Sequence, residues 1–176
     1  QDQRIIVDNA LPLQQTVEIF ACLDSQTKYD LAVYHNDKPQ TYTSEDLKAM
    51  GQEKVQEMQQ QVNENAVKGI GYVYGRHKID PQGPENRLTD VLKWLNSEET
   101  LDWARQLSGH ADIVSASAQA TRVVHGNFMT RHNSINDPEQ RRLAFILNFT
   151  EGWHPDWGGL LQFFETNGTP RDSWAP

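Results

Sequence analysis

The stretch that decides the fold is Arg122-Val-Val-His-Gly-Asn-Phe-Met-Thr-Arg-His132-Asn-Ser134, followed by Arg142-Leu-Ala-Phe-Ile-Leu-Asn-Phe149 and Asp156-Trp-Gly-Gly-Leu-Leu-Gln-Phe163. Its apolar runs are short, and glycine or proline lies between them, as is typical of strands joined by turns. The pattern predicts strands over 128–134, 143–149 and 160–165. Just before this stretch, Ala116, Ala118 and Ala120 alternate with polar residues. That period of two also indicates a strand.

The part of the chain before residue 110 has a different character. Apolar residues at helical spacing predict a helix that opens at Pro12 and one long helix over about 44–62, which Thr43 and Ser44 can cap. Two shorter helices are predicted near 88–95 and 101–107. Short strands are expected over 4–11, 29–34 and 70–76.

A helical layer followed by closely spaced strands predicts an α+β fold. The change of character near residue 110 divides it into an N-terminal α/β layer, 1–110, and a strand-rich part, 111–176, within one structural domain. The predicted core combines residues from both parts: Leu47, Met58, Leu92, Leu101, Phe128, Leu143, Phe145, Leu147, Leu160 and Phe163.

Composition excludes some classes of function. The 176 residues carry a net charge of -8, which disfavours nucleic acid or an anionic membrane as the main partner and suits a basic protein substrate. No window is long and apolar enough for a membrane span, and the polar N-terminal residues are unlike a signal peptide. The single Cys22 excludes an internal disulfide and favours a reducing, cytoplasmic location, with the thiol packed in the core.

The deciding stretch resembles the metal-bearing half of Fe(II)/2-oxoglutarate oxygenases of the prolyl-hydroxylase-like branch. Their pattern is Gly-x-Phe-Leu-x-x-His-x-Asp, then an Arg-led apolar strand ending in Leu-Asn, then Trp-Gly-Gly and another strand. Gly126, Phe128, Met129 and His132 fall into that register. The resemblance implies a double-stranded β-helix, or jelly roll, of which roughly four of eight strands are present. Further chain or a homo-oligomer would then cover the open strand edges.

The resemblance also implies Fe(II) and 2-oxoglutarate as cofactors, ascorbate as a supporting reductant, and hydroxylation of a protein or peptide substrate, usually at proline. In this family the His-x-Asp pair reaches one metal because residues two apart on a strand share a face. His132 takes the histidine position, and Ser134 stands where the carboxylate is expected. Arg122 and Tyr74 are the candidates for the co-substrate pocket. The sequence also ends before a distal histidine and arginine can be assigned, and no catalytic residue is named.

Three interpretations remain open. The chain is an oxygenase, a catalytically impaired binding module, or a halogenase-like variant in which the missing carboxylate leaves room for a halide. A literal His154-Pro-Asp156 is also present, but its proline and the following Gly158-Gly159 predict a turn, where the same-face argument does not apply. Asp137, which could replace the carboxylate, lies in a turn signal.

Overall fold

The computed structural model describes residues 4–132 and 140–176. Its helices are α1 (Leu13–Ala21), α2 (Ser44–Met50), α3 (Gln52–Val67), α4 (Arg87–Leu95) and α5 (Glu98–Ser108). A π-helical turn, Cys22–Gln26, extends α1, and a 3-10 turn spans Pro155–Trp157. The strands are β1 (Asp30–His35), β2 (Lys38–Tyr42), β3 (Tyr72–Lys78), β4 (Gln119–Arg122), β5 (Phe128–Met129), β6 (Leu161–Phe164) and β7 (Pro170–Trp174).

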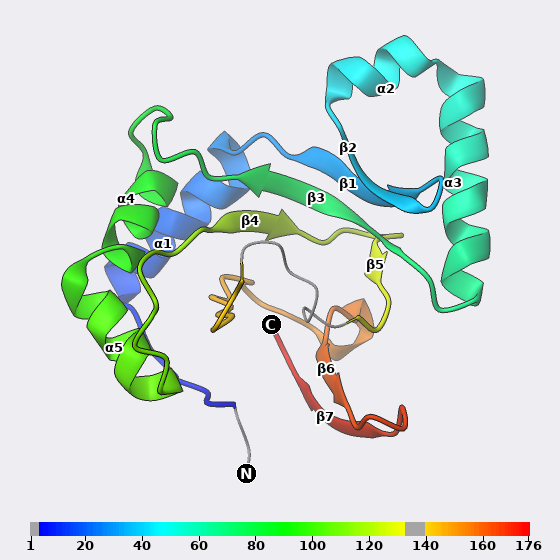
Figure 1. Ribbon diagram of the computed structural model, residues 1–176. Coiled ribbons are helices and arrows are strands. Elements are labelled where there is room, and N and C mark those ends of the chain that lie inside the picture. Colours follow the sequence, from blue (N-terminus) through cyan, green and yellow to red (C-terminus); the bar gives the residue numbers. More distant parts are fainter. Residues whose placement is uncertain (1–3, 133–139) are drawn as a thin grey trace.

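Two antiparallel sheets carry these strands (Figure 1). The larger has the order β2-β1-β3-β4, and β5 pairs with the far half of β3 beside β4. β6 and β7 form a separate hairpin. Because β4 and β5 both pair with β3, the chain after residue 110 completes the sheet that the first part begins. The mixture of helices and antiparallel sheets confirms the α+β prediction, whereas the closed jelly roll stays a prediction.

The helices begin where the sequence offers capping groups. Thr43 accepts from the Asp46 backbone N–H and Asp46 accepts from the Thr43 N–H, forming a capping box at α2. Asn86 does the same with Thr89 at α4. The predicted single helix over 44–62 is wrong in one respect. Gly51 has φ of +82°, a conformation that an L side chain rarely adopts, and it divides the segment into α2 and α3.

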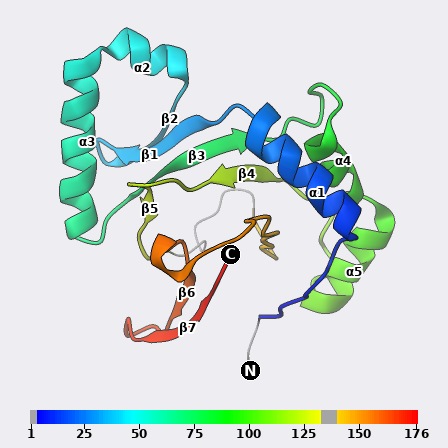
Figure 2. The ribbon, with the colours of Figure 1, turned by 180° about the vertical axis from the view of Figure 1, so that it is seen from behind.

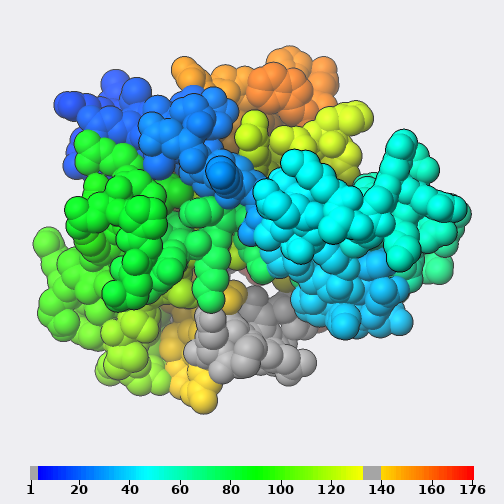
Figure 3. Space-filling view, turned by 90° about the horizontal axis from the view of Figure 1, so that it is seen from above, coloured from blue at the N-terminus to red at the C-terminus, as the bar shows by residue number. Residues whose placement is uncertain are grey.

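The helices cover one face of the larger sheet with two apolar clusters (Figures 1 and 2). Under α3, Met58 and Val62 pack on Val33 and Val73. Under α1 and α4, the cluster consists of Ile19, Cys22, Ile79, Leu88, Leu92 and Ala120. Figure 3 shows the α2–α3 lobe and the group of α1, α4 and α5 as separate masses at opposite ends of the molecule.

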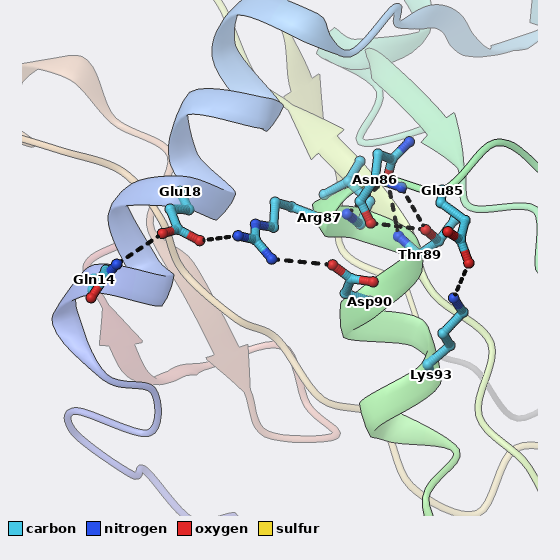
Figure 4. A network of polar contacts seen from close by, with 9 residues as sticks. Gln14, Glu18, Glu85, Asn86, Arg87, Thr89, Asp90 and Lys93 are labelled. Carbon is cyan, nitrogen blue, oxygen red and sulfur yellow. Dashed lines mark hydrogen bonds and ion pairs between the residues drawn. The ribbon is translucent and has the colours of Figure 1, made fainter.

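A polar network joins α1 to α4 on the surface (Figure 4). Arg87 pairs with Glu18 of α1 at 2.5 Å and with Asp90 of its own helix at 3.3 Å. Lys93 pairs with Glu85 at 2.9 Å between exposed side chains. Of these pairs, only Arg87–Glu18 joins the two helices. Exposed ion pairs contribute little, so the apolar cluster beneath the helices supplies most of the stabilisation.

The opposite face of the sheet carries a row of tyrosines. Tyr34, Tyr72 and Tyr74, called here the tyrosine row, lie with ring centroids 6.4 Å and 5.4 Å apart in that order. Arg76 continues the row along β3, since residues two apart on a strand share a face. Burial raises the pKa of Tyr72, and the neighbouring Tyr74 raises it further.

Several sequence predictions need correction. No strand forms over 4–11 or 143–149 among the described residues, and β4 is shorter than the alternation suggested. Strands β2 and β7, which are polar and contain Pro39 and Pro170, were missed. Of the predicted core, Met58, Leu92 and Leu101 are buried, but Phe145 and Leu160 are 41% and 40% exposed. Within the described ranges, no helix combines the length and apolar character that a bilayer crossing needs.

Candidate functional site

His132, the predicted iron ligand, lies just beyond the end of β5. The backbone N–H and the hydroxyl of Thr130 both donate to the Gly71 carbonyl, at 3.0 Å and 2.8 Å, and so fix the start of this segment against the sheet. Strand β5 ends at Met129, and His132 is exposed. The prediction that His132 lies on a strand and faces the interior is therefore wrong for this structure.

The His132 ring nevertheless has a defined neighbour. Its Nδ1 lies 3.0 Å from the Thr130 carbonyl oxygen. Because a carbonyl only accepts, Nδ1 must carry the proton in this contact, which leaves the Nε2 lone pair available. A backbone carbonyl that holds the other ring nitrogen is the arrangement found behind many metal-bound histidines. The role of His132 as an iron ligand remains a prediction.

The rest of the expected metal site is not assembled in the described part of the chain. Ser134 and Asp137 lie outside the described residues. Within 4–132 and 140–176, no group of three or more His, Cys, Asp or Glu side chains could hold a metal ion. The described residues therefore do not fit a complete Fe(II) site. Of the predicted metal-site residues, His132 is the one that lies within the described ranges.

Arg122 and Tyr74, the predicted co-substrate residues, lie on adjacent strands but on opposite faces. Arg122 is directly opposite Gly75 in the β3–β4 ladder, so its side chain leaves the sheet on the side away from Tyr74. Tyr74 is only 8% exposed within the tyrosine row. This arrangement does not bring the two side chains into one pocket.

Arg122 instead lies above Tyr29, with its guanidinium carbon 5.8 Å from the ring centroid. The Tyr29 hydroxyl donates to the Leu23 carbonyl at 2.9 Å. Burial raises the pKa of Tyr29, while the positive charge of Arg122 acts to lower it. The contact ties β4 to the turn that follows α1, which is a structural role.

The His154-Pro-Asp156 segment forms a turn, as predicted. Residues Pro155–Trp157 form a 3-10 turn, and the Asp156 backbone N–H donates to His154 Nδ1 at 3.2 Å. The Asp156 side chain is 89% exposed. Gly158 and Gly159 have φ of +70° and +74°, and a Cβ on Gly158 would meet nothing within 4 Å. The positive φ of the backbone, and not the space around it, requires glycine at position 158.

Two features near His132 escaped the sequence analysis. The first is the tyrosine row, whose signal was the period-two spacing of Tyr72 and Tyr74. The second is Arg131, whose guanidinium carbon lies 5.9 Å from the Phe164 ring centroid. The same guanidinium fills the space beside Gly168, because a Cβ added to Gly168 would lie 2.5 Å from an Arg131 nitrogen. Arg131 thereby connects the His132 segment to the β6–β7 hairpin, a contact between distant parts of the chain that local sequence does not reveal.

Comparison with known proteins gives one similarity, and it covers the C-terminal third of the chain. Residues 118–176 match the family model of the 2OG-Fe(II) oxygenase superfamily. The match contains β4 to β7, His132 and the Trp157-Gly-Gly turn, and it supports the superfamily assignment. Iron and 2-oxoglutarate are the cofactors that this superfamily implies. Neither the curated proteins nor the solved structures gave a match to the chain.

Proposed function

We propose that the chain is an Fe(II)/2-oxoglutarate-dependent oxygenase-family protein of the prolyl-hydroxylase-like branch, acting on a protein or peptide. The match over residues 118–176 carries the oxygenase assignment. The branch and the substrate rest on the Gly-x-Phe-Met register before His132 and on the net charge of -8, which suits a basic protein substrate. The jelly roll, the cytoplasmic location and a role for ascorbate belong to the same proposal.

In this proposal His132 supplies an imidazole nitrogen to the iron, and Ser134 marks the position of a lost carboxylate. When bound, the iron and 2-oxoglutarate would supply the oxidising chemistry. The chain's own contribution is to hold the His132 ring through the Thr130 carbonyl oxygen. A neutral hydroxyl is a weak ligand compared with a carboxylate, so we expect weak Fe(II) binding and no turnover of 2-oxoglutarate by the chain as given.

A second candidate is a non-catalytic binding module. The Ser134 substitution favours it, because a site with one fewer negative charge loses much of its affinity for Fe(II). A halogenase-like variant is the third, and it requires chloride for iron binding or turnover. The three differ in what metal and co-substrate do to the purified chain.

The test is an anaerobic Fe(II) titration with and without 2-oxoglutarate, followed by absorption spectroscopy. The unmodified chain should bind Fe(II) weakly and give a charge-transfer band when co-substrate is added. Ser134→Asp should tighten Fe(II) binding by roughly 10–100-fold, the size of effect seen when ligand surroundings are altered. His132→Ala should abolish the band.

His154→Ala is the matched control, because His154 is an exposed histidine in the same part of the chain. It should leave the titration unchanged. Absence of Fe(II) binding by both the unmodified chain and Ser134→Asp would reject the oxygenase proposal in favour of the binding module. Succinate release at an enzymatic rate by the unmodified chain would show that the metal site lies elsewhere, and a requirement for chloride would favour the halogenase-like variant.

A further inference from the structure

The turn between β6 and β7 contains a pair of residues that can react with each other. Asn167-Gly168 is the one asparagine–glycine pair in the sequence, and Asn167 is exposed. Glycine has no Cβ, so no side chain hinders the approach of its backbone nitrogen to the preceding asparagine amide. Asn148 is also exposed, but the bulky Phe149 follows it. The hairpin turn thus combines exposure with the least hindered neighbour.

A hydrogen bond in the turn holds the Asn167 amide in position. Its Oδ1 accepts from the Thr169 backbone N–H at 2.9 Å, which closes a ring that mimics a backbone turn. The Asn167 Cγ and the Gly168 nitrogen both belong to this ring, and the ring keeps them near each other. The Thr169 N–H also points at the oxygen that gains negative charge when Cγ is attacked, and it stabilises that charge.

A second hydrogen bond opposes the attack. The Gly168 N–H donates to the Glu165 carbonyl at 2.9 Å, and its nitrogen can attack only when this bond opens and the proton leaves. The bond closes an exposed hairpin turn, where local opening needs little free energy. The turn therefore slows the reaction without preventing it.

The reaction needs no reagent besides water. The deprotonated Gly168 nitrogen bonds to the Asn167 Cγ, the Cγ–Nδ2 bond breaks, and ammonia leaves after taking up a proton. Water then opens the five-membered succinimide. Its addition at Cγ gives aspartate, and its addition at the main-chain carbonyl carbon gives isoaspartate. Either product carries one negative charge more than the unmodified chain, whose net charge is -8.

Arg131 is the cation beside this turn. A Cβ built on Gly168 would lie 2.5 Å from an Arg131 nitrogen, so the guanidinium lies against the turn. Arg131 is exposed, and its contact with the Phe164 ring, at 5.9 Å, is comparable in strength to an exposed ion pair. A new carboxylate can therefore compete for the guanidinium. Arg171, the cation on β7, is paired with Glu165 at 3.5 Å.

We propose that Asn167 deamidates spontaneously through the Gly168 nitrogen, and that the carboxylate formed at position 167 pairs with Arg131. The modification is independent of the proposed oxygenase function, because it uses no metal and no co-substrate. Arg131 precedes His132 and connects its segment to the β6–β7 hairpin. The added charge therefore acts on the contact between these two parts of the chain.

Peptide mapping by mass spectrometry tests the reaction in the folded chain. During prolonged incubation in native buffer, Asn167 should lose its amide at least about tenfold faster than Asn148. The rate should rise with pH, because the deprotonated nitrogen attacks. Asn167→Gln is the matched control, since a glutamine amide would have to close a larger ring, and it should abolish the modification at this position. Equal rates at Asn167 and Asn148, or an undiminished rate in Asn167→Gln, would overturn the reaction.

A variant that carries the product side chain tests the pairing with Arg131. In freshly purified protein, Asn167→Asp should raise the Tm by about 1–3 °C, the effect of one exposed ion pair in a chain of this size. The same substitution should lose most of this rise in an Arg131→Gln background and keep it in an Arg131→Lys background, where the positive charge remains. An equal rise in the Arg131→Gln background, or no rise in the otherwise unmodified chain, would reject the pairing.

Discussion

Arg4 and Asp172 are 168 positions apart in the chain, yet their side chains form an ion pair of 3.1 Å. The same guanidinium lies 4.3 Å from the Phe163 ring centroid and 5.6 Å from that of Trp174. The Arg4 side chain is only 16% exposed. The first described residue therefore holds the β6–β7 hairpin, which as a two-stranded sheet would be marginal alone.

Replacing Arg4 with Ala should lower the free energy of unfolding by about 1–2 kcal/mol, since it removes a cation–π contact and a partly buried ion pair. Chemical denaturation followed by tryptophan fluorescence measures the change. Lys93→Ala is the control, because its pair with Glu85 joins side chains that are 61% and 86% exposed. If both variants lose the same stability, Arg4 has no special role at the hairpin.

Leu92 and Phe145 should respond differently to truncation. Leu92 is 6% exposed within an apolar cluster, and Leu92→Ala should cost about 2–5 kcal/mol through lost burial and a remaining cavity. Phe145 is 41% exposed, so Phe145→Ala should cost clearly less, about 1 kcal/mol. Urea denaturation of the two variants compares them directly. A larger loss for Phe145 would restore it to the core that the sequence predicted.

Asn86→Ala should destabilise α4 by about 1 kcal/mol. The Asn86 Oδ1 accepts from the backbone N–H groups of Leu88 and Thr89, at 2.9 Å and 3.1 Å, and alanine cannot replace it. Asn86→Asp keeps an acceptor at the N-terminus of the helix and should retain most of the stability. Thermal unfolding by circular dichroism checks both, and equal losses for the two variants would contradict a capping role.

The pKa of Tyr29 provides a test of the Arg122 contact. Burial raises this pKa above 10.0, and Arg122 opposes the rise. Because the folded pKa is the higher one, the stability contributed by neutral Tyr29 is complete below the unfolded pKa near 10 and is lost as pH rises through the folded pKa.

Arg122→Gln should raise the pKa of Tyr29 further and move that loss to higher pH. Ultraviolet titration of the tyrosinates, with Tyr29→Phe to assign the signal, measures the shift. A lower Tyr29 pKa in Arg122→Gln would mean that the guanidinium does not lie over the ring in solution.

Local signals in the sequence predicted the helices better than the strands. Helix α4 follows from the spacing of Leu88, Leu92 and Leu95, which lie within one short window. A strand depends on a partner that can be distant. The 143–149 segment has the pattern of a strand but forms none within residues 4–132 and 140–176, while polar β7 forms because β6 lies beside it.

The candidate site was predictable only in part for the same reason. The motif indicated the superfamily whose family model matches residues 118–176 and made His132 a candidate ligand, because residue order is enough to match a family pattern. Which side of the sheet a residue faces depends on register, and register placed Arg122 opposite Gly75 and so away from Tyr74. Sequence alone did not contain that pairing.

Because Cys22 is buried, the rate at which a reagent labels its thiol reports how often the surrounding structure opens. The Cys22 side chain, in a residue 4% exposed, packs between α1 and the sheet, so an alkylating reagent can reach it only when that layer separates. The rate of Cys22 labelling in native buffer, compared with the rate in denaturant, therefore gives the free energy of that opening. Labelling under increasing urea would then tell whether the α1 layer separates on its own or only when the whole molecule unfolds.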